Sequence, residues 1–276
     1  MNIKKILISL FVLCFAIVCF IGCTHTTTQS AHGKVAVITK GSDSDFWSDL
    51  KSGAVTAATE YNLELTVEGP DNESDCEAQN KLIRNAISRK VDVIVLSAID
   101  YNNTAPAVQE AVDSGIKVIM IDSNVNVKNT QSFIGTNNIQ AGKKAGEAVE
   151  KLCKDKGKIY IGIVSSGENT ENNNERQQGF ADYIGTLENA EIVKTVYVSS
   201  DQDNATAEAK RLLTEHPESM LLSALTSGRL SAWEWQYPSL TLPIMSAASA
   251  LTAILNASVC SKQAKLTLLL FKIRLR

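Results

Sequence analysis

Two carboxylates that could bind a polar ligand each follow an apolar run of the chain. Asp100 comes shortly after the run at 91–96, and Asp122 directly follows the run at 116–121. A carboxylate in such a place can accept hydrogen bonds from two hydroxyl groups of a sugar, and charge-assisted bonds of this kind are strong. Asp100 can instead cap the helix predicted after it, and its position favours that role. No predicted helix closely follows Asp122, which favours ligand binding there.

Aromatic, amide and guanidinium groups supply further candidates for the same kind of site. Phe46 and Trp47 begin a predicted helix after the first apolar run. Aromatic faces suit the apolar C–H face of a sugar ring, although both rings could instead pack in the core. Asn137 and Asn138 lie at the junction of the predicted lobes, where an amide can reach a ligand or a hinge. Arg176 begins another predicted helix, where it can either bind a ligand or be solvated.

The elements that must position these residues alternate in the first half of the chain. Short runs rich in Val and Ile predict buried strands, and amphipathic segments between them predict helices. The expected strands are 35–39, 63–67, 91–96 and 116–121, and the expected helices are 46–61, 76–89 and 105–114. Near-continuous apolar strands separated by helices are typical of an α/β fold with a parallel sheet covered on both faces.

The same alternation starts again near residues 135–138. Strands are expected at 132–135, 158–164 and 192–198, and helices at 140–152, 175–187 and 205–215. This restart predicts two Rossmann-like lobes joined by a hinge, an N-terminal lobe at 34–136 and a partial C-terminal lobe at 137–218. Ligands of open α/β sheets bind beyond the carboxyl ends of the strands. The candidate residues are therefore expected to line a cleft between the lobes.

The first residues predict an exported protein. Lys4 and Lys5 precede the apolar run Ile6–Ile21, an order typical of a secretory signal at 1–22. The run is shorter than the roughly 20 residues that a spanning helix needs. Phe20–Cys23 resembles the lipobox of bacterial lipoproteins, which implies that Cys23 carries the lipid and that 23–33 is a flexible tether. The alternative is an uncleaved anchor with an incidental cysteine.

Composition and cysteine spacing exclude several classes of function. The net charge of −3 and the lack of a dense Lys/Arg patch give no reason to expect a nucleic-acid partner. The three cysteines outside the signal and lipobox form neither a disulfide framework nor a metal-binding spacing; they are Cys76, Cys153 and Cys260. The three histidines are scattered. We therefore expect no catalytic residue, no metal and no cofactor.

The segment from Lys34 to about Glu218 resembles the periplasmic sugar-binding family of the ribose-binding type. The motifs that carry the resemblance are Phe46-Trp47, the turn at Asp100, Ile121-Asp122, Gly135-Thr-Asn-Asn138 and the Arg-x-x-Gly-Phe pattern in Glu175–Phe180. The resemblance implies that Phe46 and Trp47 stack on the ligand and that Asp122 and Arg176 hydrogen-bond its hydroxyl groups. Ser123 stands where ribose binders have Arg, so the sugar need not be ribose.

The family also implies a function and partners. A protein of this kind is not an enzyme; it captures a monosaccharide or similar polyol for an ABC permease in the membrane. We expect a monomer, exported and held at the outer face of the cell membrane by its lipid alone. The alternative is a ligand-sensing subunit that feeds a membrane receptor or histidine kinase, and the sequence leaves it open.

Two other classes with related folds are disfavoured. A Rossmann enzyme would need a G-x-G-x-x-G turn after the first strand, whereas Lys40–Asp45 has one glycine and two carboxylates that would repel phosphate. A ligand-responsive repressor would carry a helix-turn-helix head, and the predicted signal occupies that place.

The composition changes abruptly after Glu218. Leu, Ser, Ala and Thr crowd 219–276, and the strand–helix alternation stops. A shifted reading frame permits CTNERTTLG over 224–232, GFDSN over 250–254 and VVQNPF over 270–275, and all three resemble signatures of the sugar-binding family in the family's order. We therefore predict that 219–276 is out of frame, without a selected core, and that the chain binds ligand weakly or not at all. The alternative is a divergent C-terminal segment.

Overall fold

The computed structural model describes residues 33–222, except 43, 153, 155, 156, 167 and 199–201. The predicted signal, Cys23 and almost all of the predicted out-of-frame segment lie outside the described residues. No helix within the described part of the chain is both long and apolar enough to cross a membrane.

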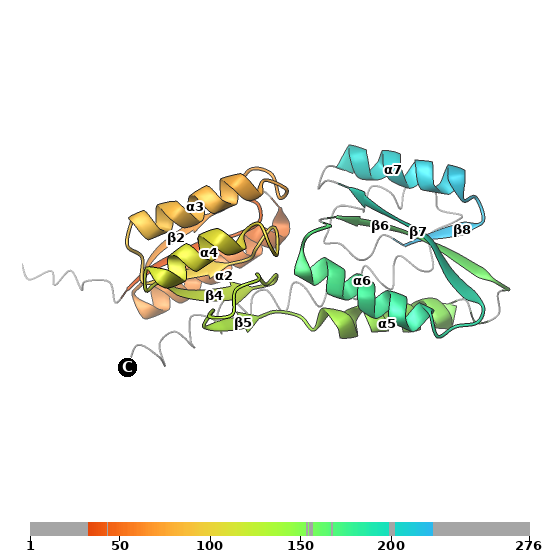
Figure 1. The fold of residues 1–276 in the computed structure, drawn as a ribbon, viewed down its shortest axis with the longest axis horizontal. Helices are drawn as coiled ribbons and strands as arrows, with labels where there is room; N and C mark the ends of the chain where they lie inside the picture. The colour runs from red at the N-terminus through yellow and green to blue at the C-terminus, as the bar shows by residue number, and fades with distance from the viewer. Residues whose placement is uncertain are drawn as a thin grey trace, which may run out of the picture. The chain divides into compact units, whose positions relative to one another are not determined.

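The first lobe is built on a parallel sheet of five strands in the order β2-β1-β3-β4-β5 (Figure 1). The strands are β1 (Lys34–Ile38), β2 (Glu64–Glu68), β3 (Val93–Leu96), β4 (Lys117–Ile121) and β5 (Ser132–Ile134). The two central strands β1 and β3 pair in register from Val35–Val93 to Ile38–Leu96. Both run in the same direction, so the residues that follow them lie at one edge of the sheet, as predicted.

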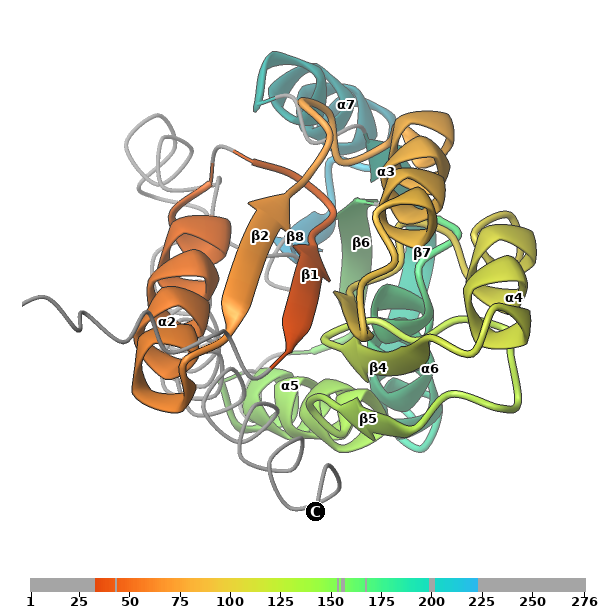
Figure 2. The ribbon, with the colours of Figure 1, turned by 90° about the vertical axis from the view of Figure 1, so that its left-hand side faces the viewer.

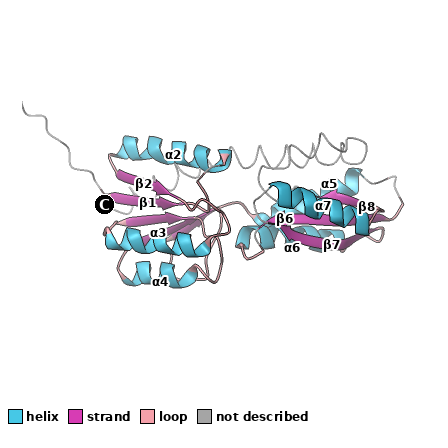
Figure 3. Ribbon diagram, turned by 90° about the horizontal axis from the view of Figure 1, so that it is seen from above, coloured by secondary structure: helices cyan, strands magenta, loops and turns pink. Residues whose placement is uncertain are grey.

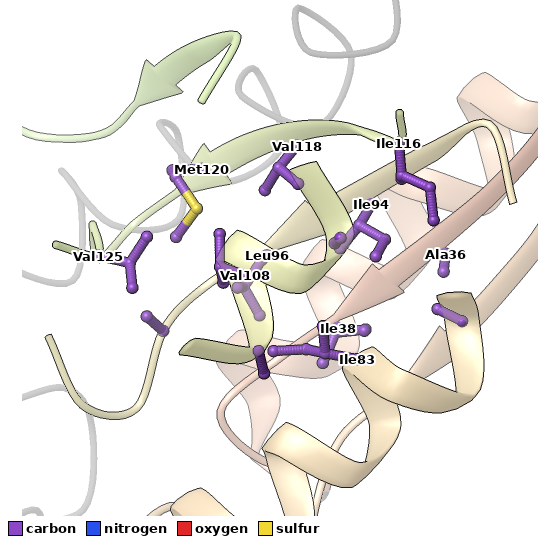
Figure 4. Packing of buried hydrophobic residues seen from close by; sticks show 14 of the residues in the cluster. Ala36, Ile38, Ile83, Ile94, Leu96, Val108, Ile116, Val118, Met120 and Val125 are labelled. Atoms are coloured by element: carbon purple, nitrogen blue, oxygen red, sulfur yellow. The ribbon is translucent and has the colours of Figure 1, made fainter. Parts of the chain in front are cut away.

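Three helices cover both faces of this sheet. They are α2 (Asp45–Tyr61), α3 (Cys76–Ser88) and α4 (Ala105–Asp113). Figures 2 and 3 show α2 on one side of the strands and α3 and α4 on the other. Successive strand side chains point to opposite faces, so the apolar runs supply both cores: Ile38 and Leu96 pack under α3 and α4, and Val37 and Val95 pack under α2 (Figure 4 shows the first cluster).

Local capping fixes where the first helices begin. The Ser44 side chain accepts a hydrogen bond from the Trp47 N–H, and the Asp75 side chain accepts one from the Ala78 N–H. Such N-caps satisfy backbone donors that have no partner inside the helix. They set α2 and α3 directly after the strand-end loops, and so they also place the residues that follow β1 and β2.

The second lobe has a smaller parallel sheet in the order β7-β6-β8. Its strands are β6 (Ile159–Ser166), β7 (Ala190–Val198) and β8 (Ser219–Leu222), and its helices are α5 (Asn138–Leu152), α6 (Glu171–Ile184) and α7 (Gln202–Glu215). One core joins β6 to α5 and α6 around Phe180 and Ile184. The other joins β6 and β7 to Leu212 of α7. The lobe is thus layered helix–sheet–helix like the first.

Two glycines allow α5 and α6 to pack at close range. A Cβ atom at Gly142 would lie 2.0 Å from the backbone oxygen of Arg176, and one at Gly179 would lie 2.1 Å from that of Ile139. Real Cβ atoms do not approach so closely, so both positions require glycine. This explains part of the Arg-x-x-Gly-Phe pattern: Gly179 permits the helix contact, and Phe180 is fully buried in the core.

The structure confirms the predicted fold class and corrects the start of one helix. Helix α6 begins at Glu171 rather than at Glu175, because the Asn-rich stretch that reads as a loop forms its first turn. Strand β8 occupies Ser219–Leu222 and pairs in parallel with Tyr160–Ile163 of β6. Backbone pairing in the second sheet therefore includes the four residues that follow Glu218.

Candidate functional site

The candidate site is centred on Asp122, at the end of β4. Its carboxylate accepts a hydrogen bond from Ser97 Oγ at 2.9 Å and forms an ion pair with Lys40 Nζ at 3.1 Å. The backbone of Asp122 has φ 56°. A left-handed conformation is uncommon outside glycine and is tolerated by Asp and Asn. It turns the chain sharply as it leaves β4, so the carboxylate lies beside the ends of β1 and β3.

Lys40 is the cation of the first lobe that sequence reasoning missed. It lies two residues beyond β1, and only 7% of the residue is exposed. A buried ammonium group is costly unless it is paired, and Asp122 provides the pair. A lysine directly after an apolar strand is an available signal, because buried strand ends seldom carry charge without a reason. Ser97, which follows β3, was likewise not predicted as a site residue.

Asn172, in the first turn of α6, contacts both Lys40 and Asp122 from the second lobe. Its Nδ2 donates to the two carboxylate oxygens of Asp122 at 3.1 and 3.2 Å, and its Oδ1 accepts from Lys40 Nζ at 3.3 Å. One amide thus satisfies an anion and a cation together. Asn172 was also missed, because the predicted helix began after it.

Two backbone groups of the first lobe reach the same end of α6. The Asn124 N–H donates to the Glu171 carboxylate at 3.0 Å. The Tyr101 N–H donates to the backbone oxygen of Asn169, also at 3.0 Å. The loops after β3 and β4 therefore bind directly to the loop and first turn of α6, and the predicted site residues lie among these contacts.

Arg176 lies one turn further along α6, at the same site. Its guanidinium donates to Asn138 Oδ1 at 2.6 Å. Burial lowers the pKa of the Arg176 guanidinium, and the Asp122 carboxylate acts in the opposite direction. Arg176 is half-buried and bonded to Asn138, so the structure disfavours the interpretation of Arg176 as a solvated helix residue.

Of the two amides predicted at the lobe junction, Asn138 contacts another predicted site residue and Asn137 does not. The Asn137 side chain is exposed and accepts a hydrogen bond from the Gln140 N–H at 3.0 Å, so it caps the start of α5. Its neighbour Asn138 is buried and contacts Arg176. Capping orients the two amides differently, and the amide at the site belongs to Asn138.

The two aromatic residues differ in their surroundings. Trp47 is 5% exposed, belongs to the core under α2, and donates from Nε1 to Glu73 at 2.7 Å. Its ring is covered, so the structure favours the core alternative for Trp47 over stacking on a ligand. Phe46 is half-buried and meets Trp47 edge to face, with ring centroids 4.7 Å apart. Stacking by Phe46 stays a prediction.

Asp100 does not cap the helix that follows it, and contact with a ligand stays a prediction for this residue. Its Oδ1 accepts from the N–H groups of Asn102 and Asn103, at 2.8 and 2.7 Å. The residue before α4 is Thr104, so Asp100 does not cap that helix. An Asp that binds the backbone just after itself stabilises a tight turn. Asp100 therefore shapes the loop whose Tyr101 N–H reaches the second lobe.

Two further residues singled out in the sequence are structural. Ser123 is fully buried and its Oγ has no hydrogen-bond partner among the described residues, so it presents no surface to a ligand. Cys76 is a free thiol whose Sγ lies 3.4 Å from Thr104 Oγ1, and burial raises the pKa of that thiol. A thiol with a raised pKa is a poor nucleophile at neutral pH. Cys153 and Cys260 lie outside the described residues.

Comparison with known proteins agrees with the fold. The sequence model of the family described as a periplasmic binding protein domain matches residues 35–251. The match covers more than half of the chain, and the chain therefore belongs to this family. The match also extends beyond Glu218. The relatives and solved structures that resemble the chain are solute-binding or sugar-transport proteins.

Individual relatives are sugar-binding proteins of the ribose-binding type, as the motifs implied. The D-ribose/D-allose-binding protein of Pseudomonas aeruginosa is 27% identical over 203 residues, which is 71% of this chain and 62% of the relative. A sugar transporter structure from Clostridium phytofermentans is 37% identical with a TM-score of 0.64, over 68% of this chain and 70% of that one. A solute-binding protein of Agrobacterium vitis with bound D-fucose is 30% identical with a TM-score of 0.64, over 68% and 66%.

The chain spans less than two thirds of the length of the curated relatives that it matches. It spans 62% of the Pseudomonas relative and 61% of a D-apiose import binding protein from Actinobacillus succinogenes. The part that is matched contains both lobes and the residues around Asp122.

Proposed function

We propose that this protein is the substrate-binding lipoprotein of an ABC importer and captures a monosaccharide or similar polyol between its two lobes. The observation that carries the proposal is the group formed by Lys40, Asp122, Asn172 and Arg176, which is drawn from both lobes and lies at the carboxyl ends of the strands. Carboxylate, ammonium and guanidinium groups make strong, directional hydrogen bonds to hydroxyl groups.

The contacts of Asn172 support a specific mode of sugar binding. The Asn172 amide donates to Asp122 and accepts from Lys40. A sugar hydroxyl is likewise both a donor and an acceptor, so a pair of ring hydroxyls can make the same bonds to Asp122 and Lys40. We infer that sugar binding exchanges some of the Asn172 contacts for contacts to the ligand, and that Phe46 lies against the ring.

Calorimetric titration tests the sugar class. D-ribose, D-allose and D-fucose are titrated into the protein, with amino acids and inorganic phosphate as the competing classes. We expect a version with the restored frame to bind at least one sugar saturably and to bind none of the amino acids or phosphate. Binding of amino acids or phosphate alone would contradict the proposal. Titrations use both the chain as it stands and a version with the shifted frame restored.

Membrane attachment depends on Cys23 in this proposal. The lipid is the sole anchor, so the Cys23→Ser variant is expected to appear in the soluble fraction of broken cells, whereas the unchanged protein sediments with membranes. Fractionation without detergent, followed by immunoblotting, measures the distribution. A Cys23→Ser protein that still sediments with membranes would show that the apolar run itself is the anchor.

We also propose the domain limits 34–136 and 137–218 and a change of reading frame in the gene close to the end of the second lobe. The order of the three family-like strings supports this proposal, while the family match to residue 251 favours a divergent segment instead. Resequencing the gene is expected to reveal a one-base slip near the codons for 218–222. An intact frame together with tight sugar binding by the 276-residue chain would rule the proposal out.

A further inference from the structure

Gln79 of α3 is a fully buried amide beneath the candidate site. It belongs to neither of the apolar clusters, and no sequence motif drew attention to it. A buried glutamine must satisfy two donors and an acceptor, so its partners show what it does.

All three partners of Gln79 are backbone groups just beyond the ends of two neighbouring strands. Its Nε2 donates to the oxygens of Thr39 and Ser97, both at 2.9 Å. Its Oε1 accepts from the Ile99 N–H at 2.9 Å. The orientation of the amide is unambiguous, because carbonyl oxygens only accept hydrogen bonds and a backbone N–H only donates.

The hydrogen bonds of Gln79 connect β1 and β3 where the backbone hydrogen bonds between these two strands end. The last backbone bond between the two central strands runs from Ser97 N–H to Ile38 oxygen. Beyond it the Thr39 and Ser97 oxygens and the Ile99 N–H are each bonded to Gln79. Gln79 thus joins the two chains where they leave the sheet, and it satisfies backbone groups of a kind that is almost always paired when buried.

The residues held in this way carry the polar groups of the site. Thr39 immediately precedes Lys40, which pairs with Asp122 at 3.1 Å. Ser97 itself donates to Asp122 from Oγ at 2.9 Å. The two strand ends therefore set the positions of two donors to one carboxylate.

We propose that Gln79 is a positioning residue for the sugar site: it fixes the distance between the ends of β1 and β3 and thereby aims Lys40 and Ser97 at Asp122. The proposal rests on the proposed function for its biological meaning, but the geometry that it describes exists without a ligand. Binding groups need to be held within fractions of an ångström by such supporting contacts.

The reactivity of the Lys40 amine tests the proposal without any sugar. Lys40 is nearly buried and paired, so it should react slowly with an acylating reagent, whereas Lys51 is exposed and serves as the internal reference. In the full chain carrying Gln79→Met, we expect the rate at Lys40 relative to Lys51 to rise about tenfold, which corresponds to the loss of one or two buried hydrogen bonds. Mass spectrometry of peptides gives both rates.

Asn80 provides the matched control. It lies on the same helix, is buried, and donates to the Asn103 oxygen at 3.0 Å rather than to a strand end. Asn80→Leu should lower the stability of the lobe but leave the relative rate at Lys40 unchanged. An unchanged rate in Gln79→Met, or an equal rise in Asn80→Leu, would overturn the positioning role. Absence of sugar binding by the version with the restored frame would instead refute the proposed function and leave this result standing.

Discussion

Replacing Asp122 with alanine is expected to lower the free energy of unfolding by about 3 kcal/mol, because it leaves the Lys40 ammonium buried without its counterion. Lys40 is 7% exposed and has Asp122 at 3.1 Å. The same change removes the acceptor for Ser97 and Asn172, and with it the acceptor proposed for a sugar. Sugar affinity is expected to fall by about 100-fold, in line with the loss of a charged hydrogen-bonding partner. Urea denaturation and calorimetric titration measure the two effects.

Two further variants serve as comparisons for Asp122→Ala. The first separates the effect of the charge from that of the backbone, and the second tests an exposed ion pair. Asp122→Asn keeps the size of the side chain and tolerates the left-handed backbone, so any loss that remains comes from the missing charge. Glu110→Gln breaks the exposed pair between Glu110 and Arg84. Exposed pairs contribute little, so that variant should unfold like the unchanged protein. If Asp122→Ala and Glu110→Gln unfolded at the same urea concentration, the buried Lys40–Asp122 pair would not contribute more to stability than an exposed pair.

Replacing Gly142 with alanine is expected to destabilise the second lobe by about 3 kcal/mol, at the upper end of overpacking effects. The new methyl group would lie 2.0 Å from the Arg176 oxygen, which is backbone and cannot move aside without shifting α6. Alanine's better helix propensity would offset only about 1 kcal/mol of the clash. The shift would also move Arg176 and Asn172, so sugar affinity should fall together with stability.

Gly157→Ala is the matched control for this change. A Cβ atom at Gly157 would meet nothing within 4 Å. The same chemical substitution should therefore leave the unfolding curve and the affinity almost unchanged. Chemical denaturation followed by far-UV circular dichroism compares the variants. A Gly142→Ala protein as stable as Gly157→Ala would show that α5 and α6 are not packed as closely as the structure has them.

The alternation of strands and helices could be predicted from the sequence because it depends on local patterns. Runs such as 91–96 are apolar at nearly every position, which is the pattern of a strand buried on both faces. Parallel strands then place the residues after them at one edge, so Asp122 could be assigned to the site without a structure. The start of α6 could not be placed, because its Asn-rich first turn has low helix propensity and is stabilised by partners elsewhere in the fold.

The composition of the site was decided by contacts between residues far apart in the chain. Asn172 meets Lys40 across 132 residues and Asp122 across 50. No local sequence pattern indicates such a contact.

Neighbouring residues of similar type were separated in the same way. Asn137 caps α5 while Asn138 binds Arg176, and Trp47 is in the core while Phe46 is partly exposed. Successive residues of a helix point about 100° apart. Two neighbouring residues at a helix start therefore have different surroundings even when their types are similar.

The sequence by itself determined the class of fold, the family and the position of Asp122, because burial patterns and strand ends are encoded by residues close together in the chain. Only the tertiary structure decided that Lys40 and Asn172 complete the site and that Gln79 lies beneath it. Their partners are charges and backbone groups from other elements, and a buried polar side chain is recognisable only when those partners are known.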